Sequence, residues 1–203
     1  LLVLACFFVS GFAGLLYETT WTREFSFVFG TSNLAVATVL AAYMGGLSLG
    51  ASVAARLMHR IRRPVLVYGL LELGIAASAL AVPHLIRGVT VLYRPLFLES
   101  GILPGSGGLT SALFYGAAAF AILGIPTALM GATLPMLARH AVREESQIGG
   151  RIGTLYAVNT AGAVAGTLAG KKVLDRLPEA VYKRVVSGLI LALGLAMLLG
   201  AGR

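Results

Sequence analysis

The chain has 203 residues, of which 58% are hydrophobic and only 12% are charged, and its mean hydropathy is +0.88. Soluble domains carry about 25% charged residues, so this composition excludes an ordinary soluble fold. The formal net charge is +8, but the basic residues stand in short clusters between apolar runs, as in the loops of membrane proteins. The composition predicts an all-α, polytopic membrane protein with the lipid bilayer as its partner, and it argues against nucleic-acid binding.

The residue types needed for catalysis or metal binding are sparse. The single cysteine, Cys6, excludes an internal disulfide and a thiolate metal cluster. The sequence contains no GxxxxGK phosphate loop, no HExxH motif and no paired His/Cys spacing. His59, His84 and His140 stand near expected helix ends, where a solvated imidazole is the ordinary role. We therefore expect no catalytic residues, no metal site and no cofactor.

The first apolar helix is expected over residues 1–16, followed by the charged and aromatic cluster YETTWTRE at 17–24. An interfacial turn is one interpretation of this cluster, because Tyr and Trp favour the membrane interface. The other interpretation places Glu18 and Arg23 in a polar cavity, although a spacing of five does not put them on one helix face. The chain opens inside an apolar run, so we expect no signal peptide and allow for a natural N-terminus upstream.

The second helix is expected over 33–58, with Gly46 and Gly50 as a small-xxx-small packing pair. It ends in the densest basic loop of the first half of the chain, at 56–63.

The third helix is expected over 65–82 and contains Glu72. A carboxyl inside a spanning segment is costly, so Glu72 should face the bundle interior and find a polar partner. Arg56 and Asn159 are the candidates for that partner. The alternative is an acid near the interface whose side chain reaches the headgroups.

The fourth helix is expected over 109–137 and contains Pro126 and Pro135, each of which removes a backbone donor. Broken helices persist in membranes where protein or a watery cavity satisfies the freed carbonyls. Pro126 with Thr127, and the segment 131–135, are therefore candidate cavity linings. Kinking for packing alone is the equal alternative.

The fifth helix is expected over 152–170 and carries one amide, Asn159, in an apolar run. Gly162, Gly166 and Gly170 recur at every fourth position and form a smooth stripe on one helix face. Such a stripe lets another backbone approach closely in lipid. We expect this face to receive a neighbouring helix, and whether the last helix is that neighbour stays open.

An amphipathic interfacial segment is expected over 171–180 and a last spanning helix over 181–199, which makes six spanning helices in a single membrane domain, 1–203. The basic loops 56–63 and 139–151 indicate that their side faces the cytoplasm. The basic segment 171–184 then falls on the opposite side and contradicts this orientation. Either the helix at 149–170 does not cross the membrane, or the last segment did not originate as part of this helix bundle.

Several motifs stand in the order of a known family. They are YETTWTR at 17–23, TVLAAYMGGLSLG ending at Gly50, LELG at 71–74, MGATLP at 130–135 and GTLYAVNTAGA at 153–163. Together they resemble the membrane domain of bacterial spermidine-synthase-like proteins over residues 7–170. The last 30 residues, from Gly170, are similar instead to the end of sulfite-exporter (TauE/SafE-type) permeases.

The resemblance implies a fold like half of a major-facilitator transporter, in the inner membrane of a bacterium. The soluble aminopropyltransferase domain of that family is absent from this chain, so the resemblance implies no enzyme activity. We expect a transporter-like protein that moves or senses a small polar solute, a polyamine or an anion, through Glu18, Arg23, Glu72 and Asn159.

Two alternatives remain at this point. One is a membrane anchor for a separate soluble synthase, with homo-oligomerisation also open, and the other is an anion permease.

Overall fold

The computed structural model describes residues 2–29, 33–93, 109–142 and 144–174, together with six helical positions between 188 and 199. The long helices within these ranges are α1 (Leu2–Phe29), α2 (Asn33–Leu57), α3 (Pro64–Tyr93), α4 (Leu109–Ala141) and α5 (Ile148–Leu174). Two short 3-10 turns, η1 (Met58–Arg60) and η3 (Glu145–Gln147), lie between them, and no strand occurs in the described part of the chain. The all-helical class predicted from composition is confirmed.

Four of the described helices, α1 to α4, are long and apolar enough to cross a membrane. Their apolar stretches are 28 to 30 residues long, which at about 1.5 Å per residue exceeds the roughly 30 Å of a hydrocarbon core. The chain is therefore a membrane protein, as predicted. The count of six helices stays a prediction, because α5 is not among the four and because most of 181–199 lies outside the described residues.

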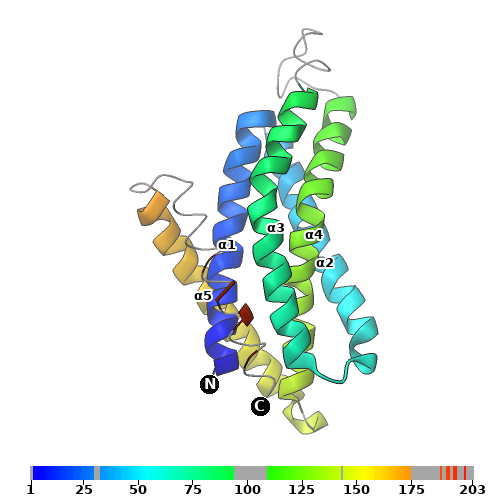
Figure 1. Ribbon diagram of the computed structural model, residues 1–203, viewed down its shortest axis with the longest axis vertical. Coiled ribbons are helices and arrows are strands. Elements are labelled where there is room, and N and C mark those ends of the chain that lie inside the picture. Colours follow the sequence, from blue (N-terminus) through cyan, green and yellow to red (C-terminus); the bar gives the residue numbers. More distant parts are fainter. Residues whose placement is uncertain are drawn as a thin grey trace.

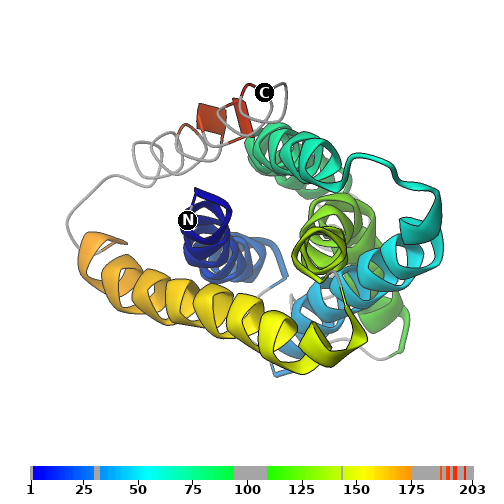
Figure 2. The same cartoon turned by 90° about the horizontal axis from the view of Figure 1, so that it is seen from below.

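The helices α1 to α4 run up and down side by side, and α5 crosses the outside of α1 at a tilt (Figures 1 and 2). The closest backbone packing joins α2 to α4, α1 to α5 and α3 to α4, whereas α1 meets α2 and α3 mainly through buried side chains. The bundle thus consists of two packing units, α2–α3–α4 and α1–α5.

The first helix continues through residues 17–29, so the expected helix end at residue 16 and the interfacial turn after it are wrong. Tyr17, Trp21, Phe25 and Phe29 recur every four residues and are all buried on one face of α1. Tyr17 stacks on Trp21 with ring centroids 5.1 Å apart, and Phe29 stacks on Tyr115 of α4 at 4.3 Å. The aromatic side chains thus extend the helix into the core instead of ending it at the interface.

The other helices also run past their expected ends. Pro83 lies inside α3, which continues to Tyr93 rather than ending at 82, with Val82 and Ile86 buried on either side of the proline. α4 reaches Ala141 instead of 137, and α5 begins at Ile148 and includes residues 171–174 of the expected amphipathic segment. The remainder of that segment, 175–180, lies outside the described residues.

Glycine contacts bring α2 and α4 together. A methyl group on Gly46 would overlap the side chain of Thr127, and one on Gly50 would overlap the backbone of Ala128. In the opposite direction, a methyl group on Gly131 would overlap the backbone of Leu47. The two backbones are therefore in direct contact, the geometry that small residues permit in lipid.

The stripe on α5 receives α1. Methyl groups on Gly162 and Gly166 would overlap the carbonyl groups of Phe8 and Phe12. Gly194, one of the six positions described in the last segment, lies instead against Leu73 of α3. The contacts of Gly170 are outside what the structure describes.

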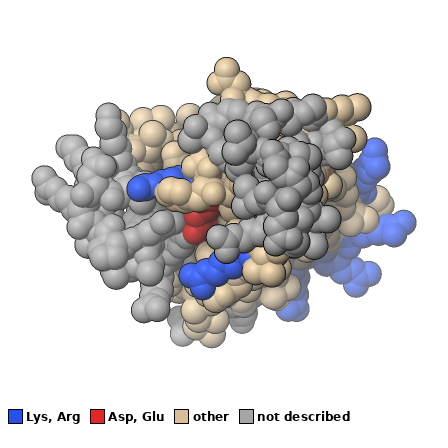
Figure 3. All heavy atoms as spheres, turned by 90° about the horizontal axis from the view of Figure 1, so that it is seen from above, with Lys and Arg blue, Asp and Glu red and all other residues tan. Residues whose placement is uncertain are grey.

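Basic residues gather at one end of the bundle. Arg56, Arg60, Arg62, Arg63, Arg139 and Arg151 are exposed there, at the ends of α2 and α4 and the starts of α3 and α5. At the other end the described exposed arginines are Arg23 and Arg87, and one small acidic patch is visible beside basic atoms (Figure 3). The loops expected in the cytoplasm thus lie at the same end of the bundle.

Replacement of Gly50 by alanine should destabilise the bundle by about 1–3 kcal/mol, because the added methyl group forces α2 away from α4. The matched control is Gly88→Ala on α3, where nothing lies within 4 Å of an added methyl group. Alanine there should leave stability unchanged or raise it by up to about 1 kcal/mol. Thermal unfolding of both purified variants in mild detergent measures the difference, and equal melting temperatures would contradict the close α2–α4 contact.

Candidate functional site

A cavity of about 190 Å³ lies between α1, α2, α4 and α5, at the boundary of the two packing units. Five of its lining side chains are polar: Ser10, Glu18, Tyr43, Thr133 and Asn159. The rest of the lining is apolar or glycine: Gly11, Gly14, Leu15, Met44, Leu47, Met130 and Ala163. A cavity between apolar helices with a few polar side chains on its lining is the ordinary setting of a small-molecule site in a membrane protein.

Helical spacing explains which residues of α1 line the cavity. Ser10, Gly14 and Glu18 are four residues apart and therefore share one face, which is the face that lines the cavity. Glu18 is half-buried and is the ionisable carboxyl among the lining residues. No lysine or arginine lines this cavity in the described part of the chain. The site therefore presents an acid without a basic neighbour on its wall.

Asn159 joins α5 to α1 at the cavity. Its Nδ2 donates a hydrogen bond to the backbone carbonyl oxygen of Phe7 over 3.1 Å. The contact depends on Gly11, where a methyl group would overlap the backbone of Asn159. The amide predicted as a polar interior residue thus has a packing role and also lines the cavity.

Tyr43 closes the cavity from α2. Its hydroxyl donates a hydrogen bond to the carbonyl oxygen of Gly14 over 3.1 Å and lies 3.6 Å from the sulfur of Met130. The ring also packs against Trp21 of α1, with centroids 6.4 Å apart. One buried tyrosine therefore links α2 to both α1 and α4 at the boundary of the two packing units.

The two prolines of α4 differ in their relation to the cavity. Thr133, just before Pro135, lines it and donates a hydrogen bond to the carbonyl oxygen of Met130 over 2.7 Å. Thr127, just after Pro126, is buried against Gly46 and donates to the carbonyl oxygen of Leu123 over 2.6 Å. Of the two candidate linings, the segment 131–135 contributes to the cavity and Pro126 with Thr127 serves packing.

Glu72 lies next to this cavity but does not line it. It is 2% exposed, and its polar neighbours are Ser10 on α1 and Tyr68 one turn earlier on α3, rather than the expected Arg56 or Asn159. Its Oε1 atom has no hydrogen-bond partner, and neither has the hydroxyl oxygen of Tyr68, among the described residues. Ser10 is shared, because it borders Glu72 on one side and the cavity on the other.

The structure therefore brings together only part of the predicted site. Glu18 and Asn159 line one cavity, and Glu72 stands behind Ser10. Arg23 is exposed and lies outside the lining, because a spacing of five turns it by roughly 140° from Glu18 around the helix.

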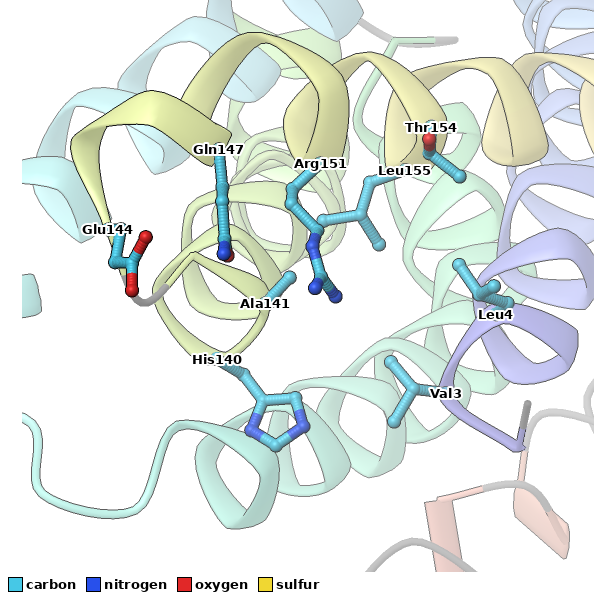
Figure 4. A pocket seen from close by; sticks show the side chains of 9 residues that line it. All are labelled: Val3, Leu4, His140, Ala141, Glu144, Gln147, Arg151, Thr154 and Leu155. Atoms are coloured by element: carbon cyan, nitrogen blue, oxygen red, sulfur yellow. The ribbon is translucent and has the colours of Figure 1, made fainter.

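A second and larger cavity, of about 810 Å³, opens at the basic end of the bundle (Figure 4). It is lined by Val3 and Leu4 of α1, by His140 and Ala141 of α4, by Glu144 and Gln147 of the connection, and by Arg151, Thr154 and Leu155 of α5. The sequence does not predict this cavity, because it indicates a solvated His140 at a helix end and a basic loop at 139–151. No local pattern connects these residues to the start of α1.

No family model, no curated protein and no solved structure matches this chain. The resemblance to spermidine-synthase-like proteins therefore stays a hypothesis that its motifs support. Within the described ranges, no three His, Cys, Asp or Glu side chains are placed to hold a metal ion.

Replacement of Asn159 by alanine should lower the free energy of unfolding by about 0.6–2 kcal/mol, because an interhelical hydrogen bond in the bilayer is lost. The matched control is Thr160→Ala, at the next position but exposed on the outer face of α5. Equilibrium unfolding in mixed micelles measures both variants. Equal decreases in the free energy of unfolding of the two variants would show that the Asn159 amide does not hold α5 to α1.

Proposed function

We propose that this chain is a transporter-like integral membrane protein that binds a small cationic solute in the cavity between α1, α2, α4 and α5. The observation that carries the proposal is the half-buried Glu18 carboxyl on a cavity wall without a lysine or arginine among its described lining residues. The resemblance to spermidine-synthase-like proteins supports a polyamine as the solute class and the bacterial inner membrane as the location.

The charge of the cavity favours a cation over an anion. Electrostatic attraction is stronger inside a bundle than in water, so an ammonium group next to Glu18 gains more than it would at the surface. Ser10, Tyr43 and Asn159 add oxygen atoms that can accept hydrogen bonds from an amine. An anion in the same place would lie beside one carboxyl and close to a second, Glu72, which disfavours the anion-permease alternative.

The position of the cavity supports movement of the solute. The cavity lies between the α1–α5 unit and the α2–α3–α4 unit, whose backbones approach each other less closely than the backbones inside each unit. The aromatic contacts of Phe29 and Tyr115 join the two units at one end of α1. Rocking of one packed unit against another around a central site is the common mechanism of secondary transport.

Replacement of Glu18 by glutamine should weaken binding of a radiolabelled diamine such as putrescine by about tenfold or more, because a charge-assisted hydrogen bond of about 1.5–3 kcal/mol is lost. The matched control is Glu24→Gln, which makes the same change on the same helix outside the cavity lining. Binding is measured by equilibrium dialysis of the detergent-purified chain and normalised to the folded fraction.

Unchanged putrescine binding by the Glu18 variant would refute the cavity as the cation site. Wild-type binding of sulfite without binding of putrescine would favour the anion permease instead. Uptake into proteoliposomes separates transport from anchoring, because a membrane anchor would show no Glu18-dependent accumulation of putrescine.

A further inference from the structure

The larger cavity at the basic end has two chemically different walls. Arg151 and His140 direct their side chains into it from α5 and from the end of α4, and the Gln147 amide lies beside them (Figure 4). Val3 and Leu4 of α1 and the buried Leu155 of α5 form the apolar part. A cationic and hydrogen-bonding wall thus faces a hydrocarbon wall.

The basic side chains of this cavity are available to a ligand. The side chains of Arg151 and His140 make no hydrogen bond or ion pair within the described part of the chain. Glu144 is the acid on the lining, and it lies toward the other side of the cavity from Leu4, where its carboxylate accepts a hydrogen bond from Ser146 over 3.5 Å. An oxyanion between Arg151 and His140 would meet donors that are otherwise unused.

The cavity lies at the end of the bundle where six exposed arginines of the described residues gather. The exposed arginines of the α2–α3 connection stand at the same end, and Arg139 Nε donates a hydrogen bond to the carbonyl oxygen of Ile61 over 3.0 Å, which joins the end of α4 to that connection. Basic residues mark the side of a membrane protein that faces the anionic leaflet. The amphipathic cavity therefore opens where lipid phosphates are concentrated.

We propose that this cavity binds the phosphate group of an anionic phospholipid, with Arg151 and His140 on the phosphate and with Val3, Leu4 and Leu155 on the adjoining acyl chain. Its volume of about 810 Å³ leaves room for a headgroup and the first part of a chain beyond the phosphate. The site is separate from the Glu18 cavity and does not depend on the solute proposed for it.

Native mass spectrometry of the full chain in detergent tests the proposal, with phosphatidylglycerol and phosphatidylcholine of identical acyl chains as probes. Wild-type protein should retain phosphatidylglycerol in preference to phosphatidylcholine. Arg151→Gln should weaken phosphatidylglycerol binding about tenfold or more, because a charge-assisted hydrogen bond to the phosphate of about 1.5–3 kcal/mol is lost. Arg62→Gln makes the same charge change outside the cavity and should leave this binding unchanged.

A third arm adds inorganic phosphate. If millimolar phosphate displaces the lipid from wild type and Arg151→Gln no longer binds phosphate, these results would support the same phosphate chemistry with a soluble source of the phosphate. Equal losses in the Arg151 and Arg62 variants would overturn the proposal, since they would indicate general surface attraction. If Arg151→Gln unfolds at a lower temperature than wild type, the His140→Gln variant is tested instead. Unchanged phosphatidylglycerol binding by His140→Gln would overturn the site.

Discussion

Direct backbone contact between α2 and α4 is the interaction on which the rest of the bundle depends. Lipid chains are as apolar as leucine, so helices in a bilayer gain little by burying ordinary apolar side chains against one another. Close packing of one helix backbone against the other holds the helices together. Gly46, Gly50 and Gly131 permit this packing, because they allow each helix to contact the backbone of the other. α3 then packs on α4, so that three helices form one unit.

The α1–α5 unit is also held together by close backbone contact, but its contacts with the α2–α3–α4 unit are of a different kind. Gly11, Gly162 and Gly166 allow α5 to lie on α1, and Asn159 fixes their alignment through the Phe7 carbonyl. Between the units the contacts are made by side chains: buried apolar and aromatic residues of α1 pack against α2, α3 and α4, and the Tyr43 hydroxyl reaches both α1 and α4. The cavity lies at this boundary, where glycines and five polar side chains contribute to its lining.

Polar groups are placed according to depth in the bundle. Glu18 and Asn159 lie on the cavity between the units, and Glu72 is held in the packed interior beside Ser10 and Tyr68. The arginines that the structure describes are exposed at the ends, six of them at one end, where Arg151 and His140 also face the larger cavity. Each polar group inside the membrane is costly, so these positions are the natural places to look for a bound solute or lipid.

The sequence by itself determined the membrane class, the helical content and the close-packing positions, because these follow from composition and from spacing along one helix. The burial of Tyr17, Trp21, Phe25 and Phe29 was also available from their four-residue repeat, although their interfacial preference concealed it. Only the tertiary structure decided that Glu72 meets Ser10, that the α5 stripe receives α1, and that His140 and Arg151 share a cavity with Val3. The physical reason is that lateral association in lipid depends on shape, so a single helix carries little information about which neighbour its face will meet.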